Sequence, residues 1–349
     1  MSVMCVGYDT PANFVFGDSL VDVGNNDYIP TLSKANYPPN GIDFPNQVPT
    51  GRFTNGRTII DILGKELGIG DFTPPYMAPS TTGPVVLKGV NYASGAGGIL
   101  NDTGALFGGR FNLDAQIDNF EKTRKYIISS IGTENASNFM KKSLFSITMG
   151  SNDFINNYLV PIFSVAERAV VPPDAFIQML ISKYRLQLTR LYSLGARKIV
   201  VVNVGPIGCI PYLRDTQNLG GSGCVALANQ LAQGFNTKLK DLVADLSKNL
   251  EGSLFVYADA YRIVDDIVSN YKSYGFEFPD RACCFLIGEH GGITPCGPGP
   301  SKVCGDRSKY IFWDAYHPSE ASNSIIAKKL LDGDTNYIYP MNVRQLVQA

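Results

Sequence analysis

Runs of apolar residues recur along the chain without the alternation of a half-exposed strand, and each ends in a small polar cluster. The five runs cover residues 13–16, 90–93, 143–149, 198–204 and 254–257. A strand of a parallel sheet reads this way because helices cover both of its faces. The run at 198–204, Lys-Ile-Val-Val-Val-Asn-Val, predicts a strand most clearly because it is rich in β-branched residues.

Segments with apolar residues at helical spacing separate these runs. They cover residues 58–63, 113–128, 175–194, 224–250, 260–270 and 319–331, and Gly195 follows the third, as is typical just past a helix end. Within 113–128 we expect Ile117, Phe120 and Tyr126 to face the core. The alternation predicts an α/β protein, a flavodoxin-like three-layer α/β/α sandwich around a five-stranded parallel sheet. Because no repeat or linker interrupts it, residues 1–349 are expected to form a single domain.

Composition narrows the classes of partner. The 349 residues are 44% hydrophobic and 17% charged, with a net charge of −1. So balanced a charge gives no reason to expect nucleic acid or an anionic membrane as a partner. No window of about 18 apolar residues predicts a membrane span. The chain also begins without a basic-then-apolar leader, so we expect a mature chain whose targeting segment has been removed.

The cysteines favour disulfides. Six of the seven lie in loop-rich stretches, where a covalent link stabilises segments that lack a core: Cys209, Cys224, Cys283, Cys284, Cys296 and Cys304. The seventh, Cys5, is expected to be unpaired. A zinc site that adds His290 to the last four is the alternative, but no Cys-x-x-Cys pair is present and His290 is expected to be structural or exposed. Together with glycosylation sequons at Asn101 and Asn135, the pattern predicts a secreted protein of the extracellular space or cell wall.

Three of the predicted strands are followed by residues that could bind a ligand or take part in a reaction. The first ends at Gly-Asp-Ser with Ser19, the second at a glycine run over 95–98, and the third at Gly-Ser-Asn-Asp with Asn152. If the first strand lies between the second and third, these ends are neighbours at the switch point where α/β proteins bind ligands. One ligand could then contact all three.

A second cluster stands near the end of the chain. Asp314 and His317 are three residues apart just before the last predicted helix, and His317 is one of only two histidines. A serine hydroxyl becomes a nucleophile when an imidazole removes its proton, and a carboxylate holds that imidazole in the required tautomer. Ser19, His317 and Asp314 therefore predict acyl transfer, with the N–H of Ser19, an N–H of the glycine run and the Asn152 amide as oxyanion donors.

Each of these residues also has an ordinary structural interpretation. Ser19 could be a turn residue, and His317 a surface residue at a helix start. Asn152 and Asp153 could cap a helix, a role we expect of Asp153. The glycine run could hold a phosphate at a helix N-terminus, although no lysine follows it as in a P-loop.

Five sequence blocks, which occur in the order typical of one protein family, favour the functional interpretation over the structural one. They are residues 16–26 (FGDSLVDVGNN), 49–56 (PTGRFTNG), 91–99 (NYASGAGGI), 150–153 (GSND) and 312–318 (FWDAYHP). The chain thereby resembles the plant-type GDSL esterase/lipases of the SGNH hydrolase superfamily. The resemblance implies Ser19 as nucleophile, His317 as base, Asp314 as its partner and Asn152 as an oxyanion donor. It also implies that the protein is secreted, has the SGNH hydrolase fold and uses no cofactor. The glycine donor is assigned to Gly98, with Gly97 in reserve.

Three functions follow as hypotheses. The first is hydrolysis of carboxylic esters, of lipid or small-molecule substrates, through an acyl-enzyme on Ser19. The second is acyl transfer at the same site to an alcohol. The third is a non-catalytic lipid- or carbohydrate-binding protein that keeps the fold. The sequence leaves open the acyl and alcohol groups, the disulfide pairing within 283–304 and the oligomeric state.

Overall fold

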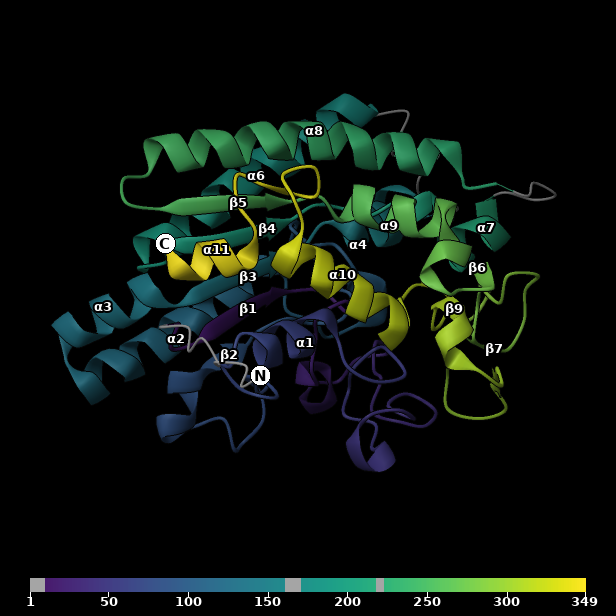
Figure 1. Cartoon of the computed structure of the whole chain (residues 1–349), viewed down its shortest axis with the longest axis horizontal. Coiled ribbons are helices and arrows are strands. Elements are labelled where there is room, and N and C mark those ends of the chain that lie inside the picture. Colours follow the sequence, from purple (N-terminus) through teal and green to yellow (C-terminus); the bar gives the residue numbers. More distant parts are fainter. Residues whose placement is uncertain (1–9, 161–170, 218–222) are drawn as a thin grey trace, which may run out of the picture.

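A central sheet of six strands organises the protein (Figure 1). The computed structural model describes residues 10–160, 171–217 and 223–349. The strand order is β10-β5-β4-β3-β1-β2, with bounds β1 Asn13–Gly17, β2 Gly89–Asn91, β3 Leu144–Thr148, β4 Lys198–Val202, β5 Leu254–Ala258 and β10 Ile338–Tyr339. Strands β1 to β5 are parallel, and β1 lies between β2 and β3. The predicted flavodoxin-like α/β fold is confirmed.

The sixth strand was not predicted. β10 is two residues long and pairs antiparallel with the edge strand β5, Ile338 opposite Ala258. So short a segment carries neither the run of apolar residues nor the alternation by which strands are recognised. It adds an edge to the parallel sheet and leaves the order of the five predicted strands unchanged.

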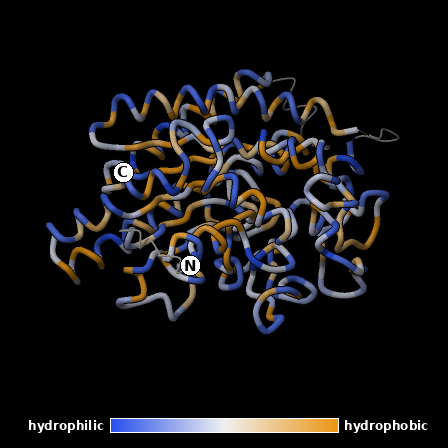
Figure 2. Tube along the Cα trace, in the orientation of Figure 1, coloured by the Kyte–Doolittle hydropathy of each residue, from blue (hydrophilic) through white to orange (hydrophobic). Residues whose placement is uncertain are grey.

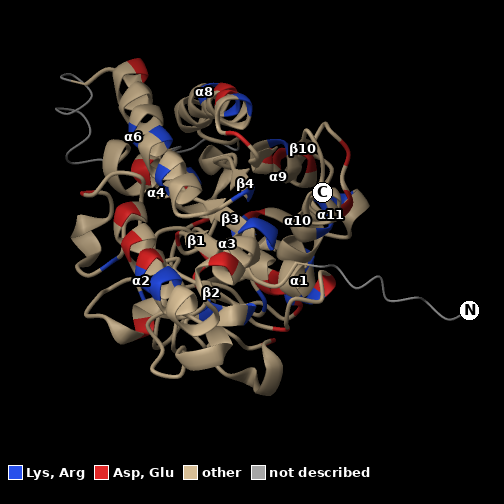
Figure 3. Ribbon diagram, turned by 90° about the vertical axis from the view of Figure 1, so that its left-hand side faces the viewer, with Lys and Arg blue, Asp and Glu red and all other residues tan. Residues whose placement is uncertain are grey.

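Helices cover both faces of the sheet. Figure 3 looks along the layers, with α2 and α6 on one side of β1 and β3 and with α1, α9 and α10 on the other. The helices are α1 Ile59–Glu66, α2 Leu113–Ile131, α3 Thr133–Lys142, α4 Ser151–Asp153, α6 Pro173–Ser193, α7 Pro211–Gln217, α8 Ala226–Asn249, α9 Ala260–Ser269, α10 Glu320–Asp332 and α11 Val343–Gln348. No helix within the described ranges is both long enough and apolar enough to cross a bilayer.

The core forms where apolar strand residues meet the helices. Phe14 and Phe16 of β1 pack on Phe120 of α2, with ring centroids 5.2 and 5.8 Å apart. Figure 2 shows the central strands as largely hydrophobic, whereas both hydropathy extremes recur along α8. Ile117 and Phe120 are fully buried as predicted, but Tyr126 is 40% exposed, so that prediction was wrong. At about 3.6 residues per turn, nine positions from Ile117 bring the helix to its opposite side.

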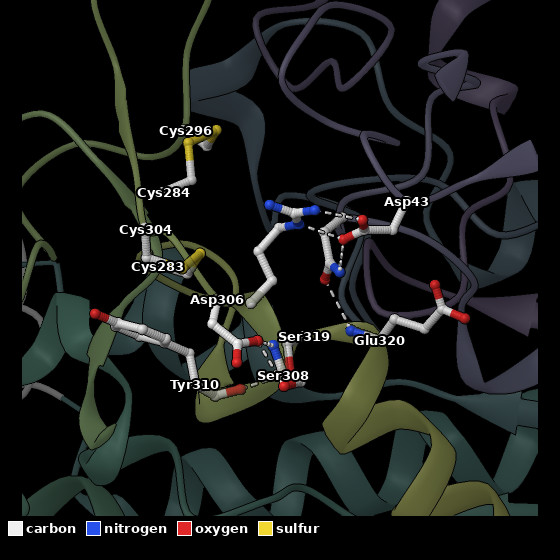
Figure 4. Close-up of a disulfide and its surroundings, with 12 residues drawn as sticks. Asp43, Cys283, Cys284, Cys296, Cys304, Asp306, Ser308, Tyr310, Ser319 and Glu320 are labelled. Carbon is white, nitrogen blue, oxygen red and sulfur yellow. Dashed lines mark hydrogen bonds and ion pairs between the residues drawn. A yellow bond between two sulfur atoms is a disulfide. The ribbon is translucent and has the colours of Figure 1, made fainter. Parts of the chain in front are cut away.

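Three disulfides tie down the loops, as expected. The pairs are Cys209–Cys224, Cys283–Cys304 and Cys284–Cys296. The last two hold the segment that contains β6 (Phe278–Ala282), β7 (Cys284–Phe285), β8 (Lys302–Val303) and β9 (Tyr310–Phe312), beside the start of α10 (Figure 4). Because all four cysteines of 283–304 are used, the zinc alternative was wrong. Cys5 lies outside the described residues.

The second histidine has a structural setting. His290 is buried, and its Nδ1 lies 2.8 Å from Oδ1 of Asp215 on α7, which also accepts hydrogen bonds from the His290 and Gly292 N–H groups. This carboxylate fastens the disulfide-rich segment to α7.

The organisation of residues 1–349 as one domain stays a prediction.

Candidate active site

The carboxyl ends of β1, β2 and β3 bring the three predicted clusters together. Because β1 is flanked by β2 and β3, Ser19 follows the middle one of these three strands, with residues 94–98 on one side and Asn152 of α4 on the other. Ser19 and Asn152 line one cavity with His317, which enters from the turn before α10. The fold therefore assembles residues that lie up to 298 positions apart in sequence.

The serine, histidine and aspartate form a continuous chain of contacts. Ser19 Oγ lies 2.8 Å from His317 Nε2, and His317 Nδ1 lies 2.8 and 2.9 Å from the two carboxylate oxygens of Asp314. Asp314 Oδ1 also accepts hydrogen bonds from the N–H groups of Tyr316 and His317, both at 2.9 Å. Asp314 and His317 are buried. The turn thus holds the carboxylate and imidazole in one fixed relation before substrate arrives.

Aromatic rings limit the motion of the imidazole. The ring of Phe53 lies 5.1 Å from that of His317, and Tyr316 lies 6.0 Å away on a neighbouring position of the turn. Phe53 belongs to the 49–56 block, whose role the sequence did not indicate. Its neighbour Arg52 is buried and forms a two-point ion pair with Asp61 of α1, with bonds of 2.8 and 2.7 Å. That pair anchors the loop that brings Phe53 to the site.

Two further carboxylates hold the backbone of the site. Asp22 accepts hydrogen bonds from Gly24, Asn25 and Gly95 N–H at 2.8 to 3.0 Å. It thereby links the strand end that carries Ser19 to the segment after β2. Burial raises the pKa of Asp22 to about 7, against the lowering effect of these N–H groups.

Asp153 performs the corresponding task from α4. It accepts from Ile99 and Leu100 N–H at 2.9 and 3.0 Å and from the Thr103 hydroxyl at 2.7 Å. We expected Asp153 to cap a helix, which was wrong, since no side-chain cap bond is present at α4. Burial raises its pKa to about 6. The glycine-containing segment is therefore clamped at both ends, by Asp22 and Asp153.

The Asn152 amide points toward the same segment. Its Nδ2 donates to Gly97 O at 2.9 Å, and its Oδ1 accepts from Asn156 Nδ2 at 2.6 Å. These two bonds fix which end of the amide carries its hydrogens. The second Nδ2 hydrogen has no acceptor among the described residues and is available to a ligand.

The cavity at this site has a volume of about 210 Å³. Apolar side chains of several elements line it beside the polar residues named above, including Leu20, Leu32, Phe53, Ile155, Ile207 and Pro295. Within residues 10–160, 171–217 and 223–349, no cluster of His, Cys, Asp or Glu side chains is arranged to hold a metal ion. The site places a serine hydroxyl in contact with an imidazole, together with hydrogen-bond donors, next to an apolar surface.

Comparison with known proteins identifies the family. Residues 14–330 match the model of the GDSL-like lipase/acylhydrolase family. The chain belongs to this family. It is 62% identical to GDSL esterase/lipase At4g16230 of Arabidopsis thaliana over 344 residues, which are 99% of this chain and 93% of that protein. It is also 53% identical to GDSL esterase/lipase At2g23540 of the same plant, over 96% of this chain and 87% of the relative.

The aspartate of this GDSL chain's Gly-Asp-Ser motif has an unusual setting. Asp18 is 1% exposed, and although Oδ1 accepts from Leu20 N–H at 3.0 Å, Oδ2 is buried without a partner among the described residues. Burial raises the pKa of Asp18 to about 7, and the nearby His317 acts in the opposite direction. The sequence marks this position as part of a motif but does not indicate a buried carboxyl with one unpartnered oxygen next to Ser19.

Proposed function

We propose that this chain hydrolyses carboxylic esters through an acyl-enzyme on Ser19. One observation carries the proposal: the contacts from Ser19 Oγ to His317 Nε2 and from His317 Nδ1 to Asp314, at 2.8 Å each. This is the relation of nucleophile, base and orienting carboxylate that serine acyl transfer requires. The relatives' names, GDSL esterase/lipase, support the same reaction.

In the first half of the reaction, Ser19 Oγ attacks the ester carbonyl carbon while His317 Nε2 takes its proton. The carbonyl π electrons move onto oxygen and form a tetrahedral oxyanion. When that intermediate collapses, the C–O bond to the alcohol breaks, and the leaving oxygen takes the proton from His317. Asp314 accepts the Nδ1–H throughout and stabilises the imidazolium.

In the second half, water takes the place of the alcohol. His317 removes a proton from the water as its oxygen attacks the acyl carbon, and it then returns that proton to Ser19 Oγ as the acid departs. The same site would serve an alcohol acceptor. The names of the relatives favour hydrolysis over transfer.

The oxyanion needs donors that are already in position. The Ser19 N–H and the second Nδ2 hydrogen of Asn152 serve here, and an N–H of the segment that contains the glycine run supplies a third. Removal of one such donor typically raises the barrier by about 3 kcal/mol. Because Gly97 O and Asn156 hold the Asn152 amide, no reorientation is required when charge develops.

The cavity supports an ester with an apolar acyl group, of small-molecule or lipid origin. Its volume of about 210 Å³ exceeds that of an apolar cavity of roughly 150 Å³, which holds a benzene ring. Leu20, Ile155 and Ile207 supply apolar contacts near Ser19. Burial of acyl methylenes would contribute roughly 0.8 kcal/mol each.

A secreted location fits the covalent structure. Three disulfides form and persist in oxidising compartments. The sequon residues Asn101 and Asn135 are both exposed, as glycosylation requires. We propose that the protein acts outside the cell.

The test compares two serines of one cavity. Rapid mixing of wild type with p-nitrophenyl acetate should give a burst of nitrophenol equal to the enzyme concentration, because acylation releases the alcohol first. Ser19→Ala should abolish the burst, whereas Ser33→Ala, a change in the same cavity wall, should keep it. Equal turnover by wild type and Ser19→Ala would exclude the proposed reaction.

A further inference from the structure

The segment after β2 can supply only certain of its N–H groups to the oxyanion. Two are already engaged: Gly95 N–H donates to Asp22 Oδ2 at 3.0 Å, and Gly97 N–H donates to Ser94 O at 3.0 Å. The described residues provide no acceptor for Ala96 N–H or Gly98 N–H. The third donor therefore has two candidates in this turn.

The neighbouring carbonyls give the direction of each free N–H. In a trans peptide the N–H points opposite to the carbonyl of the preceding residue, and neither peptide bond concerned is cis. Gly97 O accepts from Asn152 Nδ2, so the Gly98 N–H points away from the Asn152 amide. An oxyanion bound by Asn152 then lies near the carbonyl edge of the peptide between residues 97 and 98, whereas the Gly98 N–H points from the opposite edge.

The Ala96 N–H has the opposite relation to the site. Gly95 O accepts from Asn26 Nδ2 at 3.0 Å, and Asn26 is a buried residue that also accepts from the Ser94 hydroxyl at 2.6 Å. The Gly95 carbonyl is thus turned into the protein interior, and the Ala96 N–H points the other way. Ala96 lines the cavity together with Ser19 and Asn152.

The backbone at Ala96 is strained in the way this turn demands. The Ser94–Gly97 hydrogen bond closes a β-turn in which Ala96 has φ 67°, the value of the third position of a type II turn. A residue with a Cβ loses about 1–2 kcal/mol in this region. By contrast, a Cβ on Gly98 would lie 2.4 Å from the Thr103 side chain and 2.8 Å from Asp153, so that glycine is explained by packing.

We propose that the N–H of Ala96, rather than that of Gly98, is the third oxyanion donor. The assignment rests on the proposed function, since it needs an oxyanion formed at Ser19. Gly95 and Gly97 use their N–H groups to build the turn, and Gly98 leaves room for the Thr103–Asp153 clamp. An alanine thus performs the role that the glycine-rich sequence assigns to a glycine.

The test deletes one N–H at a time in the full-length protein. Replacing Ala96 by L-lactic acid, or Gly98 by glycolic acid, through nonsense suppression exchanges the N–H for an ester oxygen and keeps each side chain. With p-nitrophenyl acetate we expect kcat to fall by about 10²–10³-fold for the ester at 96. KM should change less than about threefold, and the ester at 98 should keep kcat within about threefold of wild type. The reverse ranking would assign the role to Gly98.

A second readout separates charge stabilisation from loss of shape. An ester also weakens the preceding carbonyl as an acceptor, here Gly95 O, whose donor is Asn26. If Ala96 N–H binds the oxyanion, the affinity for a trifluoromethyl ketone, which forms a tetrahedral oxyanion on Ser19, falls by the same factor as kcat/KM.

Failure of this assignment differs from failure of the proposed function. Wild-type kcat and ketone affinity in the ester-96 protein, with Ser19→Ala inactive, would overturn the Ala96 assignment alone. Equal turnover by wild type and Ser19→Ala would overturn the proposed function and this assignment with it.

Discussion

Asp61→Asn should destabilise the protein far more than a loss of one surface charge would. Asp61 is buried at the start of α1 and receives two bonds from the Arg52 guanidinium, whose side chain is only 6% exposed. It also accepts from the Thr58 N–H and hydroxyl, both at 2.8 Å. The guanidinium stands over the Phe44 ring at 4.7 Å, and with so little of the side chain exposed, bulk water is a poor substitute partner.

The magnitude follows from the charge left behind. Breaking a buried ion pair typically costs about 3–5 kcal/mol, because the remaining ion is uncompensated in a medium of low polarity. Asparagine at this third helical position keeps one oxygen that can accept the N–H of the N-cap residue Thr58, so the capping contribution of about 1 kcal/mol is not added. We therefore expect the free energy of unfolding to fall by about 3–5 kcal/mol. Asp245→Asn, at an exposed pair with Arg185, should cost less than about 1 kcal/mol.

Urea unfolding with intact disulfides, followed by Trp313 fluorescence, measures both variants. The double variant Arg52→Met/Asp61→Leu removes both charges and should be more stable than Asp61→Asn, since no buried ion remains. A loss below about 1 kcal/mol for Asp61→Asn would exclude a buried uncompensated charge as the cause, as would a double variant less stable than Asp61→Asn. Either result would mean that the pair behaves like an exposed one.

Three further predictions concern the site, a disulfide and a buried acid. Asp314→Asn should lower kcat by about 10⁴-fold at nearly unchanged KM, because the imidazole loses the partner that sets its tautomer; steady-state kinetics test this. Cys209→Ser/Cys224→Ser should lower the free energy of unfolding by about 3 kcal/mol, given a separation of 15 residues. Burial raises the pKa of Asp18 from 3.8 to about 7, so the folded state binds a proton that the unfolded state has lost, and stability falls as pH rises through that window. Relative to Asp18→Asn, wild type should lose at least about 1.4 kcal/mol from pH 5 to 8 in urea unfolding.

The sheet could be predicted because its buried strands form recognisable apolar runs in the sequence. Five mainly apolar runs predicted the five parallel strands, but the ends of the runs and of the strands differ. The fourth run was expected to reach residue 204, whereas β4 ends at Val202. Asn203 instead uses its side chain to bind Asp259 and the Tyr257 hydroxyl, a long-range arrangement that no local pattern reveals.

The chemical groups of the site were predictable, whereas their supports were not. Ser19, His317 and Asp314 could be chosen because acyl transfer demands those residue types and the family blocks contain them. Asp22 and Asp153 were visible as acidic residues, but their task depends on N–H groups 50 or more positions away. An aspartate that accepts hydrogen bonds from distant backbone N–H groups cannot be distinguished in the sequence from any other aspartate.

The oxyanion donor illustrates a further limit. A run of glycines suggests that a glycine N–H faces the ligand, since glycine lets backbone approach closely. The direction of an N–H depends on the turn and on what its neighbouring carbonyls bind, here Asn26 and Asn152. Residue type therefore predicts the segment, and only the geometry distinguishes the proposed donor Ala96 from Gly98.

During turnover, Ser19 is proposed to carry the acyl group. Acid quenching of the wild type during turnover of p-nitrophenyl butyrate, followed by peptide mass mapping, should find one butyryl group on the peptide that contains Ser19. His317→Ala should greatly slow its formation, since the base is gone. A butyryl group on another residue would exclude Ser19 as the acyl carrier. So would the absence of any butyryl group, if both the wild type and Ser19→Ala release butyrate at a steady rate.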